Sequence, residues 1–268
     1  MLVVKVPGIN AFGRTKGTRN SGEKIIAELE KIFSNEKGMK IDRKLLDVNE
    51  INLDNENLEE QEKLIYEDSR KLLEKNEKII FLGGDHSISF PIGKAFLESC
   101  NDKDEEACLI VFDSHADSII PGKEPSHEEW LRALNDSGFK AENILLVGSR
   151  NNDAEEIRFL AENKIKQISI NELLLDLENI TDLIMEFSNG KELYVSFDID
   201  VIDPAFAPAT GYKEPGGLSS REAIYIVSRI SRMKNLKVFD LVEVDAVADE
   251  KYENITVKLA AKLLAELL

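Results

Sequence analysis

Short apolar runs alternate with longer amphipathic stretches along the whole chain. Several of the runs are continuously apolar and rich in β-branched residues, which is typical of parallel strands that are covered on both faces. The predicted strands span residues 2–6, 39–48, 78–83, 108–113, 143–148, 165–170, 192–200 and 236–244. The predicted helices span Ser21–Phe33, Asn57–Glu74, Ser89–Glu98, Ser126–Ser137, Ala154–Glu162, Glu172–Phe187, Ser219–Met233 and Asn254–Leu268. This alternation predicts an α/β fold in which a mostly parallel sheet of about eight strands lies between helical layers.

No linker, repeat or low-complexity segment divides the 268 residues, so we expect a single domain over residues 1–268. No apolar run reaches the roughly 18 residues of a membrane span, and the start of the chain lacks the pattern of a signal peptide. The net charge of −17 disfavours nucleic acid as a partner and favours small cations. Cys100 and Cys108 share no metal or redox spacing, which favours a reduced, cytoplasmic protein with ordinary buried thiols.

Unusual polar residues follow several of the predicted strands. Ligands of open α/β sheets collect at the carboxyl ends of strands, so these residues are the candidates for a site. After the strand at 78–83 comes Gly-Gly-Asp-His-Ser, whose two glycines let His86 approach a site closely. Alone, this motif would be weak evidence, because a structural histidine in a turn is the commoner case.

Two more clusters follow predicted strands. Asp113, His115 and Asp117 alternate with Ser114 and Ala116, and in an extended chain the first three would face one side while the small residues face away. Such a cluster would repel itself unless a cation joined it, although a capping or surface cluster is the structural alternative.

The next strand carries the same pattern, since Asp198 and Asp200 are again two residues apart where that strand ends. Asp203 precedes proline and is expected to shape a turn.

Glu243 lies within the apolar run of the last predicted strand, where a charge is costly without a partner. The same region contains Asp240, for which a structural role is favoured, and Asp245 and Asp249, which resemble ordinary loop acids. Two of the chain's 3 histidines fall in the clusters above, and the third is His127.

The candidate ligands are two histidines and four aspartates. Oxygen-rich sites with some imidazole suit Mn²⁺ better than metals that prefer thiolates. Four carboxylates also balance two divalent cations, which favours a two-metal site over a single zinc with its usual four ligands.

With these motifs in their order, the chain resembles the ureohydrolase family of arginase, agmatinase and formimidoylglutamase. The family signatures G-G-D-H-S, D-A-H-x-D and S-x-D-x-D-x-x-D-P match residues 83–87, 113–117 and 196–204, and a later V-E-V matches Glu243. Ser114 replaces the alanine of the second motif, and the first eighty or so residues match only loosely. The resemblance implies an arginase-like α/β/α fold, two Mn²⁺ ions per chain and a homo-oligomer, either a trimer or a hexamer.

The resemblance also implies a role for each matching residue. One metal ion would be held by His86, Asp113, Asp117 and Asp198, and the other by Asp113, His115, Asp198 and Asp200. The ions would activate a water molecule that attacks the guanidinium carbon, releasing urea and an amine. Asp117 would steer the proton, Glu243 would hold the guanidinium, and His127 would pass a proton to the departing amine.

The residues that would choose the substrate depart from each family pattern. Ile119 stands where an arginase has an asparagine that helps to hold the substrate carboxylate, and the spacing to His127 is closer to that of agmatinase. Asp153 ends a stretch that resembles the arginase G-x-R-D-x-D, so it is a candidate for binding an ammonium group. Tyr212 and Lys213 replace the family's Thr-Pro in a loop beside the site.

An agmatine-like substrate is therefore slightly favoured, with arginase or formimidoylglutamase activity as the alternatives. Two further hypotheses belong to other classes. The chain could bind metal or ligand without turnover, although its complete ligand set argues against this. It could also be a zinc deacetylase of related fold, which the extra His86 and the paired aspartates disfavour.

Overall fold

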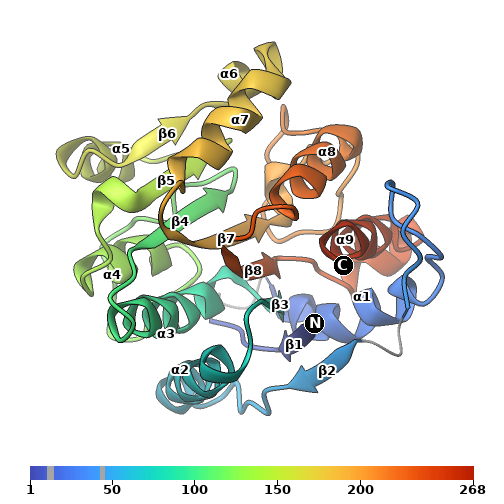
Figure 1. Ribbon diagram of the computed structural model, residues 1–268, viewed down its shortest axis with the longest axis horizontal. Helices are drawn as coiled ribbons and strands as arrows, with labels where there is room; N and C mark the ends of the chain where they lie inside the picture. Colours follow the sequence, from blue (N-terminus) through green and yellow to red (C-terminus); the bar gives the residue numbers. More distant parts are fainter. Residues whose placement is uncertain (11–14, 43–45) are drawn as a thin grey trace.

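The computed structural model describes residues 1–10, 15–42 and 46–268. Within these residues the strands form a single 8-stranded sheet with the order β2-β1-β3-β8-β7-β4-β5-β6, and every neighbouring pair is parallel (Figure 1). The strands are β1 (Leu2–Val6), β2 (Asp47–Glu50), β3 (Ile79–Gly83), β4 (Ala107–Phe112), β5 (Ile144–Val147), β6 (Lys166–Ile168), β7 (Glu192–Asp198) and β8 (Leu236–Val242). This sheet confirms the predicted fold class.

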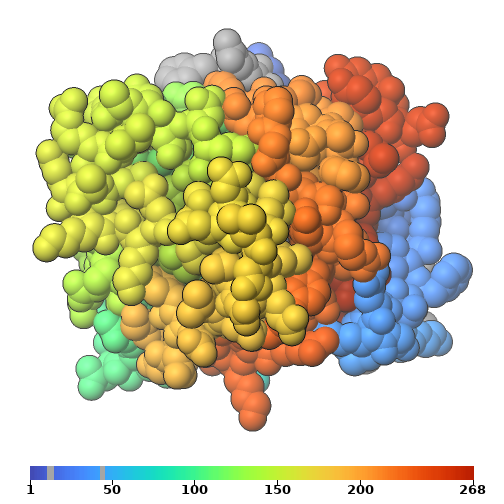
Figure 2. All heavy atoms as spheres, turned by 90° about the horizontal axis from the view of Figure 1, so that it is seen from above, coloured from blue at the N-terminus to red at the C-terminus, as the bar shows by residue number. Residues whose placement is uncertain are grey.

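Helices cover both faces of the sheet (Figure 1). They are α1 (Ser21–Leu29), α2 (Leu58–Lys75), α3 (Ser89–Asn101), α4 (Trp130–Asp136), α5 (Ala154–Glu162), α6 (Ile170–Leu175), α7 (Leu177–Phe187), α8 (Ser220–Ile230) and α9 (Ile255–Leu267). The segment with α6 and α7, yellow in Figure 2, lies beside α8, which is orange. None of the described helices is both long and apolar enough to span a membrane.

The central strands β3 and β4 are apolar throughout because they are packed on both faces. In β4, Cys108 and Ile110 belong to the core cluster that also contains residues of α8 and α9. Leu109 and Val111, which point to the other face, belong to the cluster with residues of α3 and α4. Alternate residues of one strand therefore support two helical layers, which explains why the strand shows a continuous apolar run rather than an alternating pattern.

The prediction of a strand at 39–48 is wrong in its position, since β2 spans Asp47–Glu50. Lys40 forms only an isolated antiparallel bridge with Ser34, and residues 43–45 of the predicted strand lie outside the described residues. All four residues of β2 are exposed, because this edge strand pairs only with β1. The sequence of β2 therefore lacks the apolar run that identified the central strands.

Several predicted helices differ in their limits. α1 ends at Leu29 rather than at Phe33, whose side chain is 83% exposed. α4 begins at Trp130, later than predicted. The helix predicted over 172–187 is divided at Asp176, whose side chain accepts a hydrogen bond from the backbone N–H of Asn179 and so begins α7.

Candidate metal centre

The candidate site lies at the carboxyl edge of four neighbouring strands, β3, β8, β7 and β4. His86 follows β3 in a short 3-10 helix, Glu243 follows β8, Asp198 ends β7, and Asp113 follows β4. The carboxyl ends of parallel strands meet at one edge, so residues up to 157 positions apart in the chain become neighbours, as His86 and Glu243 do.

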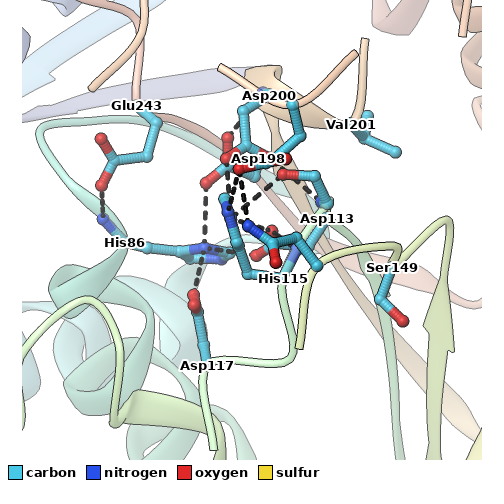
Figure 3. Close-up of polar contacts among 12 residues, drawn as sticks. His86, Asp113, His115, Asp117, Ser149, Asp198, Asp200, Val201 and Glu243 are labelled. Carbon is cyan, nitrogen blue, oxygen red and sulfur yellow. Dashed lines mark hydrogen bonds and ion pairs between the residues drawn. The ribbon is translucent and has the colours of Figure 1, made fainter. Parts of the chain in front are cut away.

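The first candidate group surrounds the imidazole of His86. Its Nδ1 atom lies 3.0 Å from Asp113 Oδ2, 3.0 Å from Asp117 Oδ2 and 3.2 Å from Asp198 Oδ2 (Figure 3). His86, Asp113 and Asp198 have ligand atoms close enough together to hold one metal ion.

The second group surrounds His115, whose Nδ1 lies 3.0 Å from Asp200 Oδ2 and 3.5 Å from Asp113 Oδ1. Asp113, His115 and Asp200 could hold another ion, so the Asp113 carboxylate faces both groups. All six predicted ligands are therefore brought together, although the distances between ligand atoms place Asp198 only in the group of His86 and Asp113.

The loops that bring these residues together are bent, not extended as predicted. Asp117 has a left-handed backbone with φ of 49°. Asp200 lies in a 3-10 turn, and its N–H donates to Asp198 Oδ1 over 2.7 Å. The Ser114 hydroxyl, predicted to face away, lies 3.0 Å from His115 Nδ1, because the bend returns it to the site.

The residues present fit a divalent cation. Asp113, Asp198 and Asp200 are at most 3% exposed. Burial, and then the charge of Asp200, raises the pKa of Asp198 well above its ordinary value, as expected for crowded carboxylates without a cation. Among the described residues, His86 Nδ1 and Asp113 Oδ2 are buried without a hydrogen bond of good geometry. Oxygen and imidazole donors with unsatisfied atoms directed at one point are what a metal ion requires.

A buried hydrogen-bond chain orients His86 from the side opposite these carboxylates. His86 Nε2 lies 2.9 Å from the Ser196 hydroxyl, which donates to Asp240 Oδ1 over 2.8 Å. Asp240 also accepts from the hydroxyls of Ser89 and Tyr194. Because Ser196 gives its proton to Asp240, it accepts from His86 Nε2–H, which leaves the lone pair of Nδ1 for a metal.

Ser196 was not among the predicted site residues, and a structural role was favoured for Asp240. Asp240 is fully buried in the apolar β8, and the same reasoning that singled out Glu243 could have found it. The register that pairs Ser196 with Asp240 became visible only in the sheet.

Glu243 has a left-handed backbone with φ of 63° and is 3% exposed. Its Oε1 accepts from the backbone N–H of His86 over 2.9 Å, whereas Oε2 is buried without a hydrogen bond among the described residues. Burial, followed by the charges of Asp198 and Asp85, raises the pKa of Glu243 well above its ordinary value. One carboxylate oxygen is thus anchored, and the other is left available to a ligand.

His127 is 4% exposed and stacks on Tyr212, with ring centroids 5.4 Å apart and planes 29° apart. In the described part of the chain, neither ring nitrogen makes a hydrogen bond. Burial lowers its pKa from the ordinary value, so the imidazole is neutral near neutral pH. It belongs to neither metal group.

A cavity of about 120 Å³ opens beside these residues. Its lining consists of His115, Asp117, Ile119, His127, Glu128, Glu156 and Tyr212. A larger cavity of about 400 Å³ lies at the opposite edge of the sheet, where β4 and β5 begin, and includes none of the predicted site residues.

The remaining predicted residues have structural contacts. Asp153 is not part of the cavity lining, and its Oδ1 accepts from the backbone N–H groups of Glu155 and Glu156 as the cap of α5. Asp203 accepts from the N–H groups of Ala205 and Gly216 and so shapes a turn, as predicted. Cys100 and Cys108 are buried and free, and Asp245 and Asp249 accept backbone N–H bonds.

Comparison with known proteins agrees with this geometry. The family model described as "Arginase family" matches residues 1–268. An agmatinase of Bacillus subtilis (strain 168) is 33% identical over 236 residues, which cover 85% of this chain and 77% of that protein. An arginase of Staphylococcus aureus (strain MSSA476) is 29% identical over 257 residues, covering 89% and 79% of the two chains. The solved structure of proclavaminate amidino hydrolase from Streptomyces clavuligerus has a TM-score of 0.86 and 26% identity, covering 99% of this chain and 89% of that one.

Proposed function

Because the chain belongs to the arginase family, and is therefore a hydrolase acting on amidino C–N bonds, we propose that it cleaves a linear guanidino compound into urea and an amine with two Mn²⁺ ions. The observation that carries this proposal is the placement of two metal-binding groups around Asp113, close to Glu243, whose buried Oε2 has no partner among the described residues.

The proposed ligands of one ion are His86, Asp113, Asp117 and Asp198. The proposed ligands of the other are Asp113, His115, Asp198 and Asp200. When bound, the ions supply a water molecule whose pKa is lowered toward neutrality and neutralise the clustered carboxylates. Mn²⁺ is proposed because the donors are carboxylate oxygens and imidazoles without any thiolate.

Glu243 is the proposed partner of the substrate's guanidinium. Its Oε1 is held by the His86 N–H, so the free Oε2 is directed rather than mobile. A charge-assisted hydrogen bond to a guanidinium would satisfy the buried oxygen and orient the carbon that reacts.

Two groups are proposed to handle protons. Asp117 lies in the first metal group and in the cavity wall. Burial, and then the charge of Asp113, raises the pKa of Asp117 to about 7. Its place beside both His86 and the cavity would let its carboxylate steer a proton during the reaction. The neutral imidazole of His127 lies in the same wall and would relay a proton to the departing amine.

The cavity favours a guanidino amine over a guanidino acid. Among the described residues, no lysine or arginine lines it. Lys213, the cation nearest in sequence to Tyr212, donates its Nζ to the Thr210 carbonyl over 3.2 Å. Ile119 offers an apolar wall, and Glu128 offers a carboxylate. A substrate carboxylate would be buried there without a partner, which is costly.

Agmatine is expected to have a higher kcat/KM than arginine. Asp153 and Glu128 form a matched pair for locating the ammonium group, since both are acids and only Glu128 lines the cavity. If Glu128 binds the ammonium group, Glu128→Gln should lower kcat/KM for agmatine several-fold and affect arginine less, while Asp153→Asn changes little. If Asp153 binds it, the two variants should behave in the opposite way. The effect is only several-fold because partly exposed charges are worth under about 1 kcal/mol. If arginine is the better substrate by about tenfold, or about 1.4 kcal/mol, the argument from Ile119 fails and Lys213 is the next residue to change.

The proposed function is tested by assaying urea released from a panel of guanidino compounds by Mn²⁺-reconstituted protein. Formimidoylglutamate is assayed alongside the panel by the glutamate it releases, because its hydrolysis yields formamide and not urea. Its turnover would support the same metal chemistry with a different substrate. Metal binding without any product would favour a non-catalytic family member. One Zn²⁺ with release of acetate from an acetylated amine would favour a deacetylase.

Affinity for Mn²⁺ and activity are expected to rise with pH. Burial alone would lower the pKa of His86 and His115, but the facing aspartates raise both above the ordinary value. Each imidazole must lose its proton before it binds a metal, so Mn²⁺ competes with protons. The Kd for Mn²⁺, measured from about pH 6 to about pH 9, should fall as pH rises. An affinity independent of pH would contradict this ligand set.

A further inference from the structure

Trp130 is the chain's only tryptophan and the first residue of α4. It is fully buried, and its indole lies against the metal centre. The ring centroids of Trp130 and His86 are 4.6 Å apart, and the planes are tilted by 34°. Trp130 Nε1 donates to Asp117 Oδ2 over 2.9 Å.

Two successive residues at the start of α4 hold Asp117. The backbone N–H of Leu131 donates to the Asp117 carbonyl over 3.1 Å, while the indole of Trp130 holds the carboxylate. Asp117 needs such support because its φ of 49° is in the left-handed region, which residues other than glycine rarely adopt. The start of α4 therefore fixes both the backbone and the side chain of Asp117.

The atom that Trp130 contacts is the one that faces the metal group. Asp117 Oδ2 accepts the indole N–H and lies 3.0 Å from His86 Nδ1. The N–H limits rotation of the carboxylate, and the ring packs against the imidazole. One side chain thus restrains two of the proposed ligands of the same ion.

We propose that Trp130 is a positioning residue that pre-forms the metal group of His86 and Asp117. This inference rests on the proposed function, because it assigns Trp130 a role through two of its ligands. Supporting hydrogen bonds of this kind orient metal ligands and maintain affinity. The competing hypothesis is that Trp130 only fills the core, like other large buried aromatic residues.

Trp130→Phe tests the proposal because it keeps an aromatic ring and removes the N–H. The Mn²⁺ content and Kd of each site are measured by equilibrium dialysis, together with kcat, KM and Tm. We expect the site with His86 and Asp117 to lose roughly 10–100-fold in Mn²⁺ affinity. This is the usual effect of removing a residue that hydrogen-bonds to a metal ligand. The site with His115 and Asp200 should keep its affinity, and kcat should fall while KM changes little.

Phe139→Leu is the matched control, since Phe139 is 1% exposed in the same core cluster as Trp130 and is not among the proposed ligands. It should lower Tm without changing either Mn²⁺ affinity. If Trp130→Phe behaves in the same way, with both affinities and kcat unchanged, Trp130 only fills the core and the proposal is overturned.

The unaltered protein offers a second test that does not depend on the variant folding. Trp130 is the single source of tryptophan fluorescence, and it touches two proposed ligands, so paramagnetic Mn²⁺ should quench its emission when the site with His86 and Asp117 is filled. Dialysis that finds both sites filled without any change in emission would overturn the proposal. Both binding tests remain decisive if no guanidino compound is hydrolysed, so failure of the proposed activity and failure of the proposed role of Trp130 can be told apart.

Discussion

Asp113→Ala is expected to remove metal from both sites. Its two oxygens face different imidazoles, with Oδ2 3.0 Å from His86 Nδ1 and Oδ1 3.5 Å from His115 Nδ1. Loss of this carboxylate deprives both groups of a ligand. Activity should fall by more than the roughly 10–100-fold that follows loss of a residue that only hydrogen-bonds to a metal ligand. Elemental analysis after Mn²⁺ reconstitution and dialysis measures the ions that remain.

The comparison variants make this result specific. His115→Ala should weaken only the second site, and Asp198→Ala should disturb both if Asp198 also bridges as proposed. Asp203→Asn is the control, because the Asp203 carboxylate accepts backbone N–H groups in a turn and should leave the metal content unchanged. If the Asp113→Ala variant retains one full ion per chain, Asp113 is not a ligand that both sites share. A single ion in the parent protein would contradict the two-metal proposal itself.

His127→Ala is expected to keep both ions and to lose roughly 10²–10⁴-fold in kcat, the usual contribution of a placed acid–base group. His127 belongs to neither metal group but lines the cavity. Its neutral ring, held against Tyr212, can take up and release a proton. Steady-state kinetics and metal analysis on the same preparation separate the two properties.

Tyr212→Phe is the matched control for His127→Ala, since it keeps the stacked ring beside His127 and should retain most of the proton-transfer rate. Imidazole added to His127→Ala should restore part of the activity. Loss of metal with activity would make His127 a ligand, and an unchanged kcat would leave it a structural residue in the cavity wall.

The sequence by itself determined the strands of the central sheet and the polar residues that end them. A parallel strand covered on both faces is predominantly apolar. The strands β3 and β4 were therefore evident as continuous apolar runs and β7 as a nearly continuous one, and a carboxylate or imidazole directly after such a run had to lie at the sheet edge. This local logic was sufficient to place His86, Asp113 and Asp198 among the candidate ligands. It failed for β2, because all residues of that strand are exposed and its sequence has no apolar run.

Only the tertiary structure decided which of these residues meet and what supports them. The strand order made β8 the neighbour of β3 and β7, which brings Glu243 to His86 and Asp240 to Ser196. Asp117 reaches the site through a left-handed turn, supported by the indole of Trp130, thirteen residues further along the chain. Periodicity in a sequence reports which face of an element is buried. It does not report the order of strands or the bend of a loop, because these depend on contacts and hydrogen bonds between segments that are distant in the chain.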